Sequence, residues 1–301
     1  MTADLATGPT PAQWVAGARP RTLPAAVAPV LVGSGVAVLA GGFSWSRALL
    51  ALLVSLALQV GVNYANDYSD GIRGTDADRV GPLRLVGSGL AEPAAVKAAA
   101  FGSFAVAAVA GLVLVVLSQQ WWLLLVGAAS ILAAWYYTGG RRPYGYLGLG
   151  ELFVFVFFGL VAVCGTTYVQ LGRVTAPAVL GGVVVGALAC AILVVNNLRD
   201  IRGDSESGKH TLATRIGAPA TRAVYVGLVC VAGVGTLAIG LLSTGWALLG
   251  LVGLVLAIPA VRTVLSGAAG FRLIGVLKLT GTAELAVAVA LSAGFALAAL
   301  H

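Results

Sequence analysis

Charged residues and histidines are scarce in this chain of 301 residues. Only 10% of the residues are Asp, Glu, Lys or Arg, whereas soluble domains carry about a quarter. The two histidines, His210 and His301, are too few for a histidine-ligated zinc or iron site. The three cysteines lie singly in apolar runs, which is typical of small core residues rather than of a disulfide or metal framework. The shortage of charge excludes an ordinary soluble protein.

Apolar residues and glycine are abundant in the chain. Hydrophobic residues make up 59% of the chain, there are 41 glycines, and the mean hydropathy is +0.98. The Ala, Val, Leu and Gly runs are long and lack the alternation of a transmembrane barrel, so helices must satisfy the backbone inside the bilayer. Residues 1–18 show no basic start followed by a short apolar run and a cleavage site, so we expect no cleaved signal peptide. The sequence predicts an all-α, multi-pass membrane protein.

Apolar runs of about 17–25 residues predict membrane spans. Nine such runs are found, at 22–40, 47–66, 94–117, 121–138, 148–170, 175–197, 219–242, 245–262 and 277–300. We expect a single domain over residues 1–301. Within it, residues 22–138 and 148–262 are interpreted as two copies of one duplicated unit, followed by an additional last helix at 277–300.

The basic residues predict the orientation of these spans. A cytoplasmic N-terminus places all but two of the 18 Lys and Arg residues inside, the exceptions being Arg47 and Arg173, and it leaves the C-terminus outside. The long polar segments 67–93 and 198–218 are then cytoplasmic. Because the basic residues flank spans and form no aromatic-interleaved patch, the net charge of +7 indicates topology and no nucleic-acid partner.

Two acidic motifs follow the second and sixth predicted spans with the same opening. Asn63 and Asp67 recur 133 residues later as Asn196 and Asp200. Asp70 and Asp76 continue the first motif, and Asp204 continues the second. Residues 196, 200 and 204 are spaced by four, so they share one face of a continuing helix.

Carboxylates gathered at the ends of apolar helices are costly unless something compensates them. Oxygen ligands on two facing helix ends fit Mg²⁺, which takes one or two protein carboxylates and completes its shell with phosphate oxygens and water. The motifs therefore predict a site for two Mg²⁺ ions and a diphosphate on the cytoplasmic side. The alternative is a pair of solvated loops with helix-terminating Asp and Asn, which does not account for the repeated register.

These motifs resemble the two aspartate-rich motifs of the UbiA superfamily of intramembrane prenyltransferases. The stretches concerned are Asn66 to Asp76 and Asn196 to Ala213, and the resemblance covers most of the chain. The segments 18–24, 137–151 and 208–213 favour the branch that prenylates 1,4-dihydroxy-2-naphthoate. The long spacing from Asp70 to Asp76 departs from the Asp-xxx-Asp of the 4-hydroxybenzoate members and fits the naphthoate branch better.

The resemblance implies a UbiA-type bundle of about nine transmembrane helices around a central cavity that opens to the cytoplasmic side. It also implies transfer of a polyprenyl group from polyprenyl diphosphate to the naphthoate, with loss of carbon dioxide and diphosphate, within membrane lipids. The residues implied as ligands of the metal and diphosphate are Asp67, Asp70, Asp76, Asp200 and Asp204. The supporting hydrogen-bonding residues are Asn63, Asn66, Asn196 and Asn197.

Cations on the same side are expected to hold the diphosphate. Lys209, Arg141, Arg142 and Arg73 are the candidates, and ordinary positive-inside topology is the alternative for each. Arg19 and Arg21 are candidates for binding the acceptor's carboxylate or for capping the cavity, and topology alone would also place them there. Tyr136, Tyr137, Tyr144 and Tyr146 are interpreted first as interfacial anchors. Glu284, inside the last span, is an ionisable residue at some depth and therefore a functional suspect, but the sequence names no partner or role for it.

Rival functions remain open at this stage. Another acceptor, such as 4-hydroxybenzoate or homogentisate, would suit the same superfamily. Asp67-xx-Asp70-Gly71 also begins the motif of the CDP-alcohol phosphotransferases, but the sequence that follows departs from it. A secondary transporter would explain a duplicated unit, but transporters place polar groups near the bilayer midplane and these motifs lie at span ends.

Overall fold

The computed structural model describes residues 8–74 and 83–301, and this described part is helical throughout, joined by turns and short loops. Its helices are α1 (Pro11–Gly17), η1 (Pro20–Thr22), α2 (Pro24–Leu39), α3 (Trp45–Ile72), α4 (Pro93–Ser118), α5 (Leu123–Tyr136), η2 (Tyr144–Leu147), α6 (Gly150–Val154), the π-helical turn η3 (Phe155–Val161), α7 (Ala162–Leu171), α8 (Ala176–Glu206), α9 (Leu212–Leu242), η4 (Gly245–Leu249), α10 (Gly250–Val255), α11 (Ile258–Leu265), η5 (Gly270–Arg272) and α12 (Leu273–Ala299). The all-α class predicted from composition is confirmed.

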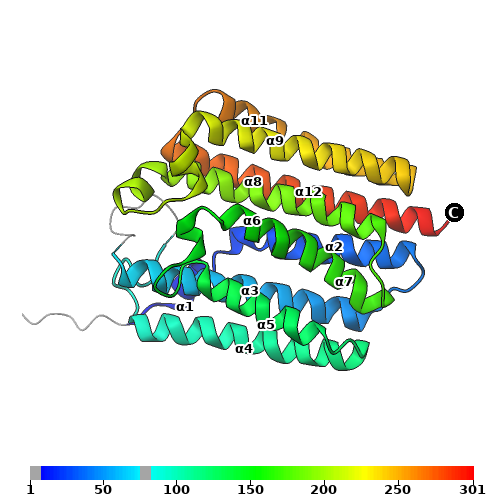
Figure 1. Ribbon diagram of the computed structural model, residues 1–301, viewed down its shortest axis with the longest axis horizontal. Coiled ribbons are helices and arrows are strands. Elements are labelled where there is room, and N and C mark those ends of the chain that lie inside the picture. The colour runs from blue at the N-terminus through cyan, green and yellow to red at the C-terminus, as the bar shows by residue number, and fades with distance from the viewer. Residues whose placement is uncertain (1–7, 75–82) are drawn as a thin grey trace, which may run out of the picture.

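The long helices lie lengthwise beside one another, with α9 and α11 along one edge of the view, α4 and α5 along the other, and α8 and α12 between them (Figure 1). In α8, 72% of the most apolar window is buried, against 28–39% in the other long apolar helices. Leu188 of α8 and Leu291 and Phe295 of α12 belong to one fully buried core cluster. Thus α8 is the central helix, and its neighbours each leave a face for lipid.

Six described helices are long and apolar enough to cross a membrane, and the number rises to eight if each of two bent helix pairs is one span. The bent pairs are Pro11–Thr22 with Pro24–Leu39, and Gly245–Val255 with Ile258–Leu265. The predicted count of nine is not confirmed. The predicted span 121–138 is α5, whose 14 residues rise only about 21 Å, less than the roughly 30 Å of a bilayer core.

The close packing of α8 against the π-helical turn depends on glycine. A Cβ atom at Gly159 would lie 2.5 Å from the carbonyl oxygen of Gly182 and 2.6 Å from Cα of Gly186. Both neighbours are backbone atoms, which cannot rotate away. Small residues at this crossing let two apolar helices approach to backbone contact, a common solution where lipid removes the hydrophobic driving force between helices.

The two helices that carry the acidic motifs end alike. In α3 the cap residue Arg73 is followed by Gly74 with φ of 70°, and in α8 the cap Ser207 is followed by Gly208 with φ of 74°. A glycine in the left-handed region just past the cap is a common helix stop, because it carries no Cβ penalty there. The C-terminus of the chain lies at the opposite end of the bundle (Figure 1).

Candidate active site

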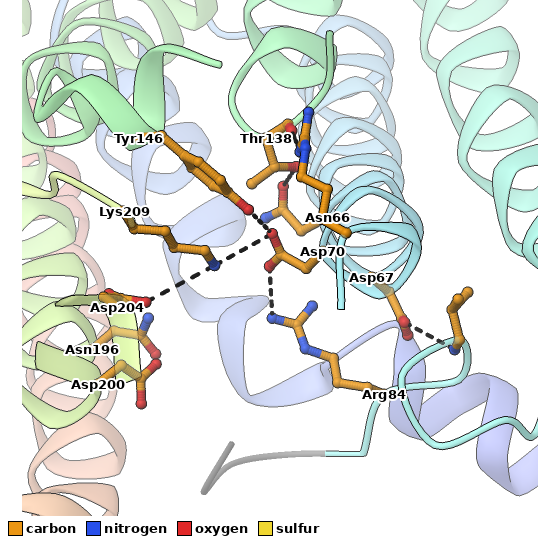
Figure 2. A network of polar contacts seen from close by, with 12 residues as sticks. Asn66, Asp67, Asp70, Arg84, Thr138, Tyr146, Asn196, Asp200, Asp204 and Lys209 are labelled. Carbon is orange, nitrogen blue, oxygen red and sulfur yellow. Dashed lines mark hydrogen bonds and ion pairs between the residues drawn. The ribbon is translucent and has the colours of Figure 1, made fainter. Parts of the chain in front are cut away.

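Lys209 connects the two motifs. Its Nζ lies 3.4 Å from Oδ1 of Asp70 and 3.9 Å from Oδ1 of Asp204, and all three side chains are largely buried (Figure 2). Asp70 comes from the last turn of α3 and Asp204 from the last turns of α8, whereas Lys209 follows the Gly208 turn. Carboxylates 134 positions apart in the sequence therefore share one cation.

Asp70 has more charged and hydroxyl partners than Asp67, the other carboxylate of the first motif that the structure describes. Its Oδ1 accepts a hydrogen bond of 2.6 Å from the Tyr146 hydroxyl, and its Oδ2 lies 3.3 Å from the Arg84 guanidinium (Figure 2). The Tyr146 ring also faces two cations, with Lys209 Nζ at 4.7 Å and Arg73 Cζ at 5.3 Å from its centroid. The charge of Asp70 is thus balanced from several directions.

Asp67 faces a different way. Its carboxylate is fully buried, points away from Asp70 (Figure 2), and accepts backbone N–H groups of Leu85 at 2.7 Å and Val86 at 3.1 Å. The two bonds hold the segment after residue 82, which carries Arg84 to Asp70. Gly71 permits this approach, because a Cβ there would lie 2.4 Å from Cγ1 of Val86. Asp67 therefore organises the chain behind the site.

In the second motif, neighbouring side chains pair with each other. Arg199 donates from Nε and NH2 to the two carboxylate oxygens of Asp200, both at 2.7 Å, and from NH2 to Asn196 Oδ1 at 2.9 Å. The fork geometry makes this a strong, charge-assisted pair. Asn197 Nδ2 donates to Oε1 of Glu151 at 3.0 Å. Asp204, one turn beyond Asp200, faces Lys209.

The loop between α5 and α6 supplies the remaining polar wall. Thr138 Oγ1 donates to Asn66 Oδ1 at 2.8 Å, and the Arg73 guanidinium donates to the backbone carbonyls of Thr138 and Gly140. Arg73 therefore fixes this loop to the end of α3. Arg141 and Arg142 are exposed and do not appear among the described residues that line the cavity.

A cavity of about 970 Å³ extends from this polar cluster into the bundle. Its polar end includes Asp70, Asp204 and Lys209, and Arg19, Arg21 and Arg84 line the same end. From there one face of α3 lines it through Asn66, Asn63, Gln59, Ser55 and Ala51, with apolar walls from α4, α5, η3 and α7. At the upper limit of ordinary ligand pockets in size, it combines an anion-binding end with a long apolar interior.

Aromatic rings form a series along one wall. Tyr144 stacks on Phe153 with ring centroids 4.0 Å apart, Phe153 on Phe157 at 6.0 Å, and Tyr137 meets Tyr144 edge to face at 5.5 Å. Burial raises the pKa of Tyr144, so its phenol remains neutral. The Tyr144 hydroxyl donates to the Ala133 carbonyl at 2.8 Å.

The described residues contain no group of three or more His, Cys, Asp or Glu side chains close enough to hold a metal by themselves. Asp76 lies outside the described residues. Asp70 and Asp204 nevertheless fit Mg²⁺ that is bound mainly by phosphate oxygens, because this ion keeps few protein ligands and several waters. An all-protein metal cage would need more carboxylates than these two.

Sequence reasoning missed the partners that come from outside the motifs. The sequence indicates only a topological role for Arg84 and an interfacial one for Tyr146, and it does not single out Gln59 or Thr138. The spacing of Arg84 and Tyr146 from the motifs follows no helical repeat. The one signal available in the sequence is therefore general: both are polar residues at the same end of the predicted spans as the motifs.

Comparison with known proteins identifies the family of this chain. A model of the UbiA prenyltransferase family matches residues 26–269. The chain is 55% identical over 285 residues to 1,4-dihydroxy-2-naphthoate octaprenyltransferase of Mycobacterium tuberculosis, covering 95% of this chain and 97% of that protein. It is 38% identical over 210 residues to the Escherichia coli protein of the same name, covering 68% of each.

Solved structures show the same fold at low identity. A UbiA homolog from Aeropyrum pernix aligns with a TM-score of 0.68 and 17% identity, covering 90% of this chain and 96% of that one. A UbiA homolog from Archaeoglobus fulgidus bound to GPP and Mg²⁺ aligns with a TM-score of 0.63 and 12% identity, covering 92% and 99%. At these identities the likeness concerns the fold alone.

Proposed function

The chain belongs to the UbiA prenyltransferase family, and from this membership we propose that it transfers a polyprenyl group from polyprenyl diphosphate to 1,4-dihydroxy-2-naphthoate, giving demethylmenaquinone. It is an integral, multi-pass membrane protein. The observation that carries the proposal is the position of Lys209, between carboxylates of both motifs at the polar end of an otherwise apolar cavity.

Asp70 and Asp204 are the proposed protein ligands of Mg²⁺, with two ions bound together with the diphosphate and with Asp76 as a further ligand. When bound, Mg²⁺ neutralises charge on the departing diphosphate. Support comes from the shared Lys209 contact and from the Mg²⁺-bound relative. For Asp67 we propose an indirect role, because its oxygens already hold the Leu85 and Val86 amides. Asp200 would act through Arg199.

The diphosphate is proposed to bind among cations of the cavity's polar end. Lys209, Arg84 and Arg199 line that end, and their charge favours a leaving group that becomes more negative as the C–O bond breaks. Asn66 and Asn196 would hydrogen-bond beside them, with Asn197 positioned through Glu151. Arg73 would act by fixing the 138–140 loop. Arg141 and Arg142 lie away from the cavity wall, and we assign them no contact with the diphosphate.

The bonding changes balance without an added base. The allylic C–O bond breaks and its electron pair leaves with the diphosphate, while an electron-rich ring carbon attacks the allylic carbon. The C–C bond to the carboxylate then breaks, its electrons return to the ring, and carbon dioxide leaves. The apolar walls and the neutral Tyr144 and Phe153 rings exclude water that would otherwise capture the allylic cation.

For the acceptor, Arg19 and Arg21 are the proposed cations that meet its carboxylate, since both line the cavity. We further propose that the cavity opens to the cytoplasm, with the N-terminus inside and the C-terminus outside. In that topology α5 counts as a ninth, short membrane segment. The positive-inside distribution of the 18 Lys and Arg residues supports this orientation.

A side-by-side acceptor assay tests the proposal. Membranes containing the full chain are incubated with a polyprenyl diphosphate, Mg²⁺ and one of three acceptors: 1,4-dihydroxy-2-naphthoate, 4-hydroxybenzoate or homogentisate. The naphthoate should be prenylated with one carbon dioxide released per product, and chelation of Mg²⁺ should stop the reaction. Prenylation of another acceptor in preference to the naphthoate would contradict the assignment, and solute uptake without any prenylation would contradict enzyme activity altogether.

A further inference from the structure

Gln59 and Asn63 lie one helical turn apart on the face of α3 that lines the cavity. Their side chains are nearly inaccessible, with 6% and 3% of their surface exposed. Asn63 lies seven residues before Asp70, about 10 Å along the helix axis, and Gln59 eleven residues before it, about 16 Å. These amides therefore sit between the diphosphate end and the apolar interior.

Thr22 of η1 determines how both amides are turned. Its Oγ1 donates its only hydrogen to the Arg19 carbonyl at 2.9 Å, so every other contact of this hydroxyl must be accepted. Gln59 Nε2 donates to it at 2.7 Å and Asn63 Nδ2 at 2.9 Å. Turning either amide over would leave two acceptors facing each other without a hydrogen.

Because the N–H groups of Asn63 and Gln59 are turned toward Thr22, each side chain keeps its amide oxygen as an acceptor. The second hydrogen of Asn63 Nδ2 goes to the Ala18 carbonyl at 2.9 Å, so only Oδ1 remains for a ligand. The Oε1 atom of Gln59 is buried and receives no hydrogen bond from the residues that the structure describes. Buried acceptors without a donor are rare in folded proteins, and one that belongs to a cavity-lining residue points to a donor that arrives with the ligand.

A donor, and not an anion, is what these oxygens can bind. A diphosphate carries only acceptor oxygens and would repel them. Their distance along α3 also separates them from ions held by Asp70. An aromatic hydroxyl group meets both requirements: it donates one hydrogen, and its ring is apolar enough for the surrounding walls.

We propose that Asn63 and Gln59 bind the two ring hydroxyl groups of the aromatic acceptor, Asn63 the one beside the reacting carbon and Gln59 the one on the opposite side of the ring. This inference rests on the proposed function and adds the basis of acceptor choice. Hydroxyl groups on opposite carbons of one ring are separated by a distance close to one helical turn, about 5.4 Å. An acceptor with a single hydroxyl leaves Gln59 unpaired.

This arrangement gives both orientation and selectivity. Each hydroxyl that donates to an amide oxygen keeps its own lone pairs available to enrich the ring in electrons. A site built around hydroxyl groups discriminates strongly against an analogue that lacks one, because the protein acceptor then stays buried and unpaired. The Thr22 anchor makes the selection rigid, since neither amide can turn to offer an N–H group instead.

Binding of two ligands to the Gln59→Leu variant tests the proposal. The dihydroxy ligand is the acceptor, 1,4-dihydroxy-2-naphthoate, whose KM is measured with the full-length protein. The monohydroxy ligand is 1-hydroxy-2-naphthoate, which lacks the hydroxyl assigned to Gln59 and is measured by its inhibition constant. The substitution should raise the KM for the acceptor about tenfold, which corresponds to the loss of one hydrogen bond. It should leave the inhibition constant of the monohydroxy ligand within about twofold of the wild-type value. The KM for the prenyl diphosphate should also stay within about twofold.

Ser103→Ala is the control, on α4 and outside the residues that line the cavity, where the hydroxyl likewise donates to a helix carbonyl, that of Ala99, at 2.9 Å. It should change neither constant. If Gln59→Leu does not accumulate in membranes, Gln59→Met is used, and the wild-type protein should in any case bind the dihydroxy compound at least about tenfold more tightly than the monohydroxy one.

The role of Gln59 would be overturned if Gln59→Leu weakened the binding of both ligands by the same factor. It would also be overturned if the wild-type protein bound both ligands with equal affinity. A parallel rise in the KM for the prenyl diphosphate would do the same, because it would indicate a general disturbance of the cavity. Failure of the wild-type protein to prenylate the naphthoate at all would instead contradict the proposed function.

Discussion

At the scale of single residues, adjacent aspartates of one motif have different partners. Asp70 faces Lys209, Arg84 and Tyr146 at the cavity, whereas Asp67 accepts two backbone N–H groups from the segment that carries Arg84. Sequence spacing placed both on the same helix end but did not distinguish them, because the direction of each carboxylate is set by donors from distant segments.

Paired substitutions at these positions should separate their roles. Asp70→Asn removes a charge that faces the reacting diphosphate, so kcat/KM should fall about 10²–10³-fold while the melting temperature changes little. Asp67→Asn replaces one acceptor oxygen by an NH₂ group opposite a buried N–H, which should cost about 1–3 kcal/mol of stability. Activity assays and thermal unfolding in detergent check both. Equal melting temperatures for the two variants, together with equal activities, would contradict the proposal that Asp70 acts in catalysis and Asp67 in stability.

At the scale of elements, the contact between the end of α3 and the segment that follows residue 82 depends on Gly71. A methyl group there would lie 2.4 Å from Val86 Cγ1 and push away the segment that brings Arg84 to the site. Gly71→Ala should therefore lower activity, at a cost of about 1–3 kcal/mol for overpacking.

The double variant Gly71→Ala with Val86→Ala should recover much of the loss, because it removes the clashing atom. Coupling between the two substitutions, measured as a double-mutant cycle on activity and stability, is the expected signature. Strictly additive effects would mean that the two residues do not meet as described.

The crossing of η3 and α8 offers a second test at this scale. Gly159→Ala places a methyl group against backbone atoms of Gly182 and Gly186, so thermal stability should fall by about 1–3 kcal/mol. Gly102→Ala in α4 is the control, since a Cβ there meets nothing within 4 Å. That control should be neutral or stabilise by up to about 1 kcal/mol, because alanine is the better helix former. Similar melting temperatures for both variants would exclude the tight crossing.

At the scale of the whole molecule, α3 runs unbroken along the cavity from Asp70 to Ala51. The 19 steps between these two residues rise about 28 Å, nearly the thickness of the bilayer core. An extended protein chain advances at most about 3.3–3.6 Å for the three backbone bonds of each residue. An isoprene unit adds four chain bonds, so by the same scaling it advances about 4.4–4.8 Å. Roughly six extended isoprene units therefore fit along this part of α3. Val30, Ala51, Leu114 and Val169 form a buried apolar cluster at the far end.

Ala51→Phe should therefore shorten the cavity and discriminate by donor length. Transfer from an eight-unit prenyl diphosphate should fall about tenfold relative to transfer from geranyl diphosphate, because only the long chain reaches the changed position. Leu49→Phe, on an exposed part of the same helix, is the control and should leave the ratio unchanged. An unchanged ratio in Ala51→Phe would mean that the chain does not extend along α3.

The sequence by itself determined the membrane class, the helical solution, the two helix ends and the family, because apolar runs, glycine stops and the register of Asn and Asp along one helix face are local information. Only the tertiary structure decided that Asp70 and not Asp67 faces the cavity, that Arg84 and Tyr146 complete the site, and that α5 is too short for an ordinary span. It also decided how Gln59 is turned. In each case the partner comes from another helix or loop, and the direction of a polar side chain depends on where that partner's hydrogen points.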